Sequence, residues 1–112
     1  MRFEGLLSDE YLLPILERIE DRSFWIYEDK AKKVKENLTG YEVKVRLREI
    51  YENIKRWKGT FGTLSKNTVF IFVHEPENPK AFKIYDTSSL GCGTSLPPPR
   101  WKIYLKELED RL

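Results

Sequence analysis

The sequence predicts a single α+β domain in which amphipathic helices pack on a small β-sheet. The chain has 112 residues, a length typical of one domain with its own hydrophobic core. Residues 41–57 carry apolar side chains at helical spacing, whereas residues 68–73 form an apolar run of strand length. Both kinds of element are therefore expected in one short chain.

The first predicted helix covers residues 8–21. Ser8 is a favourable N-cap and is followed by two acids, which suit the first turn of a helix. Pro14 lacks a backbone N–H, so this helix either kinks there or begins its main segment at that residue. Residues 23–27 are aromatic and β-branched and predict a short strand.

Residues 29–38 are predicted to form a second helix, because three apolar residues fall on one helical face. Asp29 is its expected N-cap, and Gly40 suits the left-handed residue that follows a helix. A third helix is predicted over residues 41–57, whose apolar stripe is the strongest periodic pattern in the chain. Its first residues also alternate, so a strand at 41–46 followed by a helix is the alternative.

The C-terminal half predicts a β-hairpin and a last helix. Residues 68–73 and 81–85 are strand-like, and the loop 74–80 between them contains two prolines. Residues 87–99 are rich in Ser, Gly and Pro and predict an irregular connector. Residues 100–112 place apolar side chains at helical spacing and predict a C-terminal helix.

This order of elements resembles the winged-helix fold, a helix-turn-helix followed by a β-hairpin wing. The resemblance covers about residues 8–86 of a domain that spans residues 1–86, and it implies that the helix over 42–57 reads double-stranded DNA. It predicts a DNA-binding transcriptional regulator. No catalytic residue and no cofactor follow from it.

The charge distribution agrees with a polyanion partner. Residues 29–58 carry ten bases and five acids, whereas residues 1–28 carry three bases and seven acids. Glu49 and Glu52 interrupt the bases, so a solvated helix face with internal ion pairs is the alternative. The predicted nucleic-acid contacts are Lys30, Lys32, Lys33, Lys35, Lys44, Arg46, Arg48, Asn53, Lys55 and Arg56.

Composition excludes several classes of site. One cysteine and one histidine cannot supply an internal disulfide or a zinc site rich in these residues. The N-terminal stretch has no long apolar run, so we expect neither a signal peptide nor a membrane span and place the protein in the cytoplasm. The absence of glutamine and the abundance of Lys, Arg and Glu are typical of a thermophile.

Two further functions compete with DNA binding: a small RNA-binding or RNA-cleaving protein that uses His74, and a non-catalytic interaction module or inhibitor. A small ribonuclease would use His74 and Glu75 as acid and base, with Lys83 or Arg100 stabilising charge. Cys92 lies between two glycines and indicates a connector rather than a nucleophile. A non-catalytic interaction module or inhibitor would instead use exposed aromatic residues. The predicted homodimer contact consists of Trp101, Tyr104, Leu105 and Leu108.

Overall fold

A computed structural model describes residues 2–61, 70–85 and 99–111 of the protein. Its centre is a six-stranded antiparallel sheet with the strand order β1-β4-β5-β6-β2-β3. The strands are β1 (Glu4–Gly5), β2 (Phe24–Asp29), β3 (Val34–Thr39), β4 (Phe70–His74), β5 (Ala81–Tyr85) and β6 (Trp101–Leu105). The helices are α1 (Leu12–Leu16), α2 (Gly40–Phe61) and the short 3-10 helices η1 (Asp9–Tyr11) and η3 (Lys106–Arg111).

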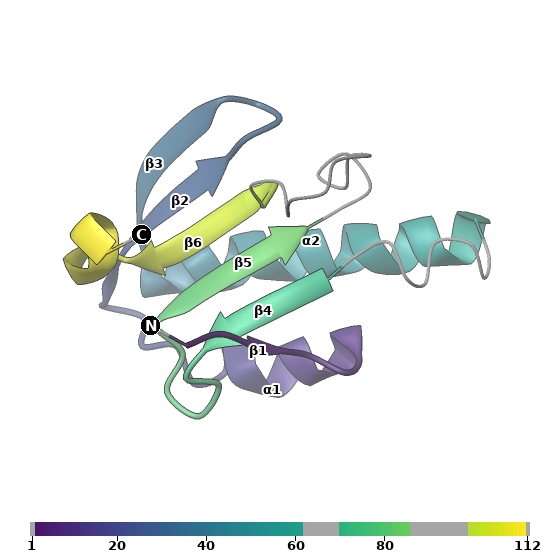
Figure 1. The fold of residues 1–112 in the computed structure, drawn as a ribbon, viewed down its shortest axis with the longest axis horizontal. Coiled ribbons are helices and arrows are strands. Elements are labelled where there is room, and N and C mark those ends of the chain that lie inside the picture. Colours follow the sequence, from purple (N-terminus) through teal and green to yellow (C-terminus); the bar gives the residue numbers. More distant parts are fainter. Residues whose placement is uncertain (1, 62–69, 86–98, 112) are drawn as a thin grey trace.

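The long helix α2 lies behind the sheet in Figure 1, and α1 runs on the same side. The main core fills the space between these helices and the strands, where Trp25, Leu47 and Phe82 are fully buried. On the opposite face of the sheet, η3 covers one end, with Leu108 packed on Ile26 and its neighbours. The sheet therefore has one face covered by helices and one face that is partly open.

The apolar stripe of α2 confirms the predicted helix. Val43, Leu47 and Ile54 are fully buried at helical spacing, as a helix that packs on a sheet requires. Because the helix begins at Gly40, residues 41–46 are helical and the alternative of a strand there is wrong. Val45 points away from the core and is 42% exposed.

The winged-helix prediction is wrong, because the described residues form a six-stranded antiparallel sheet instead of three N-terminal helices followed by a β-hairpin. Residues 29–38 contain a turn and the strand β3 instead of a helix, and β3 pairs with β2 along its whole length. Val34 and Leu38 explain the error: a spacing of four puts two side chains on one face of a helix, and also on one face of a strand. The one-dimensional pattern therefore could not separate the two structures.

The predicted C-terminal helix over 100–112 is also wrong in its first half. Trp101–Leu105 forms β6, which lies between β5 and β2 and pairs with both. Trp101 and Ile103 face the main core while Tyr104 faces the other side, so the segment alternates with a period of two. Of the described residues 100–111, Lys106–Arg111 alone is helical, as η3.

The remaining elements follow the sequence more closely. The strand at 23–27 and the hairpin of strands at 68–73 and 81–85 are confirmed as β2, β4 and β5, although residues 68–69 lie outside the described part of the chain. The first helix is shorter than predicted and consists of η1 and α1, with Pro14 inside the first turn of α1. The predicted connector at 87–99 lies outside the described residues except for Pro99.

Gly40 is the first residue of α2 rather than a left-handed helix end. Its N–H donates to the carbonyl of Ser23 at 2.9 Å. A Cβ atom at this position would lie 1.7 Å from the Glu20 carbonyl oxygen. The residue is therefore glycine because two backbone segments meet closely there.

We predict that Gly40→Ala destabilises the protein by about 3 kcal/mol, since the new methyl group forces these backbone segments apart. Urea denaturation at 25 °C measures the loss. The matched control is Gly5→Ala, whose Cβ would meet the movable ring of Phe72 at 3.1 Å, and which we expect to cost less than about 1 kcal/mol. Equal stability of the two variants would contradict the close approach at Gly40.

Candidate nucleic-acid interface

The ten predicted nucleic-acid contacts separate into two groups in the structure. Four lysines belong to the β2–β3 hairpin, and the other six residues belong to α2. Because residues 29–38 do not form a helix, the two groups do not follow one helix-turn-helix surface.

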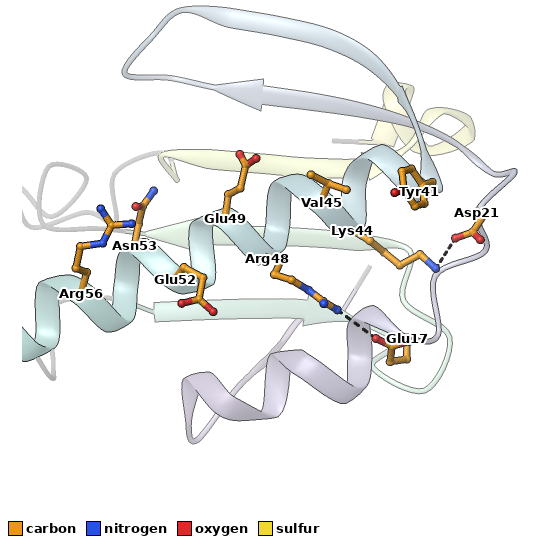
Figure 2. Close-up of a pocket in the computed structure, with 10 residues that line it drawn as sticks. All are labelled: Glu17, Asp21, Tyr41, Lys44, Val45, Arg48, Glu49, Glu52, Asn53 and Arg56. Carbon is orange, nitrogen blue, oxygen red and sulfur yellow. Dashed lines mark hydrogen bonds and ion pairs between the residues drawn. The ribbon is translucent and has the colours of Figure 1, made fainter.

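On α2, neighbouring acids neutralise the first cations. Lys44 forms an ion pair with Asp21, and Arg48 binds Glu17 at 3.2 Å. Figure 2 shows both cations reaching from α2 toward these acids. The groove along this helix continues past the further carboxylates Glu49 and Glu52 to Asn53 and Arg56. The surface has no excess of positive charge.

Arg46 and Lys55 have contacts that suit a structural role. Arg46 binds Glu36 of β3 at 3.1 Å, and its guanidinium lies 5.1 Å from the ring centre of Tyr27. Burial raises the pKa of the Tyr27 hydroxyl, and the nearby Arg46 opposes that shift. Lys55 lies over the ring of Tyr51 at 5.6 Å. Arg46 therefore joins α2 to the sheet instead of presenting its charge to a ligand.

The β2–β3 turn is built around the carboxylate of Asp29. One of its oxygens accepts hydrogen bonds from the backbone N–H groups of Ala31 at 3.0 Å and Lys32 at 3.2 Å. Lys33 adopts a φ of 55°, the left-handed conformation that returns the chain into β3. The turn therefore presents Lys30, Lys32 and Lys33 as exposed side chains.

Asp29 also attaches the hairpin to β6. The second oxygen of its carboxylate accepts a hydrogen bond from the Trp101 Nε1–H at 3.2 Å. The Arg100 Nε atom lies 3.6 Å from the first oxygen. The backbone adds a hydrogen bond of 2.8 Å from the Lys30 N–H to the Arg100 carbonyl. Asp29 is only 2% exposed, so the start of β6 and the hairpin form one rigid surface.

A groove of about 410 Å³ lies at this junction. Both carboxylates that line this groove already have hydrogen-bond donors within the protein. Asp29 binds the donors described above, and Glu28 accepts a hydrogen bond from the Tyr104 hydroxyl at 2.5 Å. Burial and this hydrogen bond raise the pKa of Tyr104. We call the surrounding cations the basic cluster, which consists of Lys30, Lys32, Lys33, Lys35, Arg100 and Lys102.

The basic cluster continues across the open face of the sheet. Lys83 of β5 lies directly opposite Lys102 of β6, which in turn lies opposite Glu28, and Glu28 lies opposite Lys35. Burial and the repulsion of Lys102 both lower the pKa of Lys83. Like charges on facing strand positions destabilise a sheet, so an anion bound here would relieve a repulsion that folding creates.

Lys83, Arg100 and Lys102 were not predicted as nucleic-acid contacts. The chain contains a related pattern in both strands, Phe-Lys-Ile-Tyr at 82–85 and Trp-Lys-Ile-Tyr at 101–104. That pattern indicates two similar strands with a central lysine. Their facing positions depend on the strand register, which the sequence does not contain.

The residues proposed for a ribonuclease do not assemble into a catalytic group. The His74 Nδ1 lies 2.6 Å from the Arg2 carbonyl, and Glu75 pairs with Lys80 at 3.2 Å. The ring of Phe3 contacts both His74, at 5.8 Å between ring centres, and the Lys83 ammonium, at 4.5 Å. Arg100 is at the hairpin junction beside Asp29, and Cys92 lies outside the described residues.

The side chains predicted to form a homodimer contact belong to the interior of one chain. Trp101 is 3% exposed, Tyr104 2% and Leu108 7%, and Leu105 packs partly buried against the core. They are buried because β6 occupies the middle of the sheet. None of the described helices combines the length and the apolar character that a membrane-spanning helix needs.

The fold and the site define a small antiparallel-sheet protein with helices on one face and a basic hairpin at its edge. A protein of the thermophile Aquifex aeolicus (strain VF5), described as an uncharacterized protein, is 42% identical over 109 residues. The match covers 97% of this chain and 88% of the relative, so the chain belongs to the family of that protein. No family model matches the sequence, and no solved structure matches it.

We predict that Asp29→Ala destabilises the protein by about 3 kcal/mol, because three N–H donors lose a buried acceptor. Asp29→Asn keeps one side-chain oxygen and should lose about half as much. Urea denaturation measures both, with the exposed Glu77→Gln as a control that stays within about 0.5 kcal/mol of the wild type. Wild-type stability of Asp29→Ala would show that the carboxylate does not hold the junction.

Proposed function

We propose that the protein binds nucleic acid in the cytoplasm through the basic cluster. The observation that supports this most directly is the groove at the β2–β3 hairpin, where five cationic side chains surround two carboxylates that are satisfied internally. Lys30, Lys32 and Lys33 form no ion pair with any residue in 2–61, 70–85 or 99–111. Their charge is available to phosphate groups.

The kind of cation favours contact with the nucleic-acid backbone. Lysine binds phosphate as a flexible point charge, whereas arginine and asparagine read base edges in a bidentate manner. Five of the six residues of the basic cluster are lysines. We therefore infer binding with little sequence preference, carried by the hairpin and not by α2, whose cations are balanced by acids.

A salt titration with a fluorescent oligonucleotide tests the proposal. Lys30→Gln/Lys33→Gln should weaken binding about tenfold at low salt and reduce the slope of log K against log salt by about 2, one unit for each lost phosphate contact. The control Lys55→Gln/Arg56→Gln removes the same charge from α2 and should leave the slope nearly unchanged.

The titration is run with duplex DNA, single-stranded DNA and single-stranded RNA. Binding to at least one of them that weakens steeply with salt supports the proposal. The proposal is wrong if the wild type binds none at 50 mM salt, or if the α2 control loses as much affinity as the hairpin variant.

We further predict that Lys83→Met stabilises the protein at pH 7 by a few tenths to about 1 kcal/mol while weakening nucleic-acid binding. It removes a half-buried charge that faces Lys102. Because the pKa of Lys83 is lower in the folded protein, this side chain loses its proton first in the folded state as the pH rises. In the unfolded chain, Lys83 stays protonated up to pH about 10.5. The stability advantage of the variant should therefore be complete at pH 7 and shrink toward pH 10.5.

Thermal unfolding of wild type and variant at both pH values measures this difference. A Lys83→Met protein that is less stable than the wild type at pH 7 would contradict the repulsion between the facing lysines.

A further inference from the structure

One row of residues crosses the open face of the sheet from edge to edge. Figure 1 views the sheet from this face, with α2 behind it. The strand register sets one residue of each strand directly opposite the next, so all members of the row lie on the same face. From β3 to β1 the row consists of Lys35, Glu28, Lys102, Lys83, Phe72 and Gly5. It therefore connects the basic cluster to the far side of the sheet.

The row is cationic at the end that meets the hairpin. Lys35, Lys102 and Lys83 span three strand spacings, roughly 14 Å at about 4.8 Å for each spacing. Two acids stand among them: Glu28, which has an internal hydrogen bond, and Glu109 of η3, which pairs with Lys35 at 2.9 Å. Together with the lysines of the turn, this end of the row keeps an excess of positive charge.

The row is aromatic at its other end. Phe72 is half-buried and lies directly opposite Lys83. On the other side of Phe72 is Gly5, where a Cβ atom would lie 3.1 Å from the Phe72 ring, so the ring extends over a position without a side chain. Tyr85 meets this ring edge-to-face at 5.7 Å between ring centres. A partly open aromatic ring is therefore held on the face that α1 and α2 do not cover.

Phe72 is separate from the hydrophobic core. Its neighbours Ile71 and Val73 are buried in the main core, whereas Phe72 belongs to neither of the two hydrophobic clusters that the described residues form. The Lys83 ammonium is held beside it by Phe3, whose ring centre lies 4.5 Å away. A cation and a partly open aromatic ring therefore occupy facing positions on two neighbouring strands.

A lysine beside an aromatic ring matches the two parts of an unpaired nucleotide. Lysine binds the phosphate, and an aromatic ring stacks on the base. In a duplex the bases present only their edges, in the grooves, so the Phe72 ring could not reach the face of a base. In a single strand the bases can turn outward and stack on protein side chains. A duplex would contact the lysines alone and leave the aromatic end of the row unused.

We propose that the open face of the sheet binds single-stranded nucleic acid, with its phosphates along the lysines of the row and one base stacked on Phe72. The bound strand runs from the hairpin across β2, β6 and β5 to β4. This inference rests on the proposed function, because the same lysines supply the phosphate contacts, and it adds the class of nucleic acid. Since every base has a face that can stack, the site selects single strands without selecting a sequence.

Fluorescence anisotropy at one salt concentration tests the class of ligand, with labelled strands of about 12 nucleotides. The wild type should bind an oligothymidylate or an oligouridylate at least tenfold more tightly than a duplex of the same length, although the duplex has twice the phosphate. An abasic strand keeps the phosphates without the bases and should bind about tenfold more weakly than the oligothymidylate. The thymidylate and uridylate arms distinguish DNA from RNA as the preferred strand.

Substitutions at Phe72 test the position of the base. Phe72→Leu removes the ring and should weaken binding of the single strand about tenfold, while the salt slope and the affinity for the abasic strand stay at the wild-type values. Phe72→Tyr keeps a ring that can stack and should remain within about twofold of the wild type. The matched control is Tyr41→Leu, which removes a ring that is 62% exposed on α2 and should have no effect. Thermal unfolding confirms that each variant is folded at the assay temperature.

The outcomes separate this inference from the proposed function. If duplex and single strand bind equally, and Lys30→Gln/Lys33→Gln weakens both, the inference is overturned and the proposed function stands. The inference is also overturned if Phe72→Leu binds the single strand like the wild type, or if it loses as much affinity for the abasic strand. A wild type that binds none of the four ligands at low salt overturns both.

Discussion

The buried carboxylate of Asp29 is the constraint on which the surface described here depends. It accepts hydrogen bonds from the turn that follows β2 and from the indole of Trp101 at the start of β6, which is 72 residues from Asp29 in the chain. An unpaired carboxylate would be costly at 2% exposure, so these donors and Arg100 must stay in place. Through this one group, the lysines of the hairpin and those of the central strands share one face.

The same arrangement separates two kinds of charge. Acids that are satisfied internally leave the hairpin and the open face of the sheet with an excess of lysine. On α2, acids alternate with bases, and Lys44 and Arg48 are paired within the chain. A surface with excess positive charge suits a polyanion, whereas the charges of α2 are balanced within the chain.

The sequence predicted the elements whose pattern is local and missed those that depend on pairing. The stripe of α2 and the strands β2, β4 and β5 could be predicted because their apolar periodicity is long or unambiguous. The strand β3 could not be predicted, since the spacing of Val34 and Leu38 suits a helix as well as a strand. The strand β6 could not be predicted either, because its pairing with β5 and β2 defines it. Asp29 was identified as a capping residue, but its partner Trp101 is distant in sequence. The facing lysines Lys83 and Lys102 likewise follow from register alone.

Nuclear magnetic resonance of the ¹⁵N-labelled protein, titrated with a short oligonucleotide of the class that binds best, tests the central claim most directly. If the hairpin and β6 form the binding surface, the amide signals of residues 30–35, 83 and 100–102 should shift together and saturate at one affinity. The signals of residues 44–56 on α2 should stay in place. Shifts along α2 with an unperturbed hairpin would contradict the account.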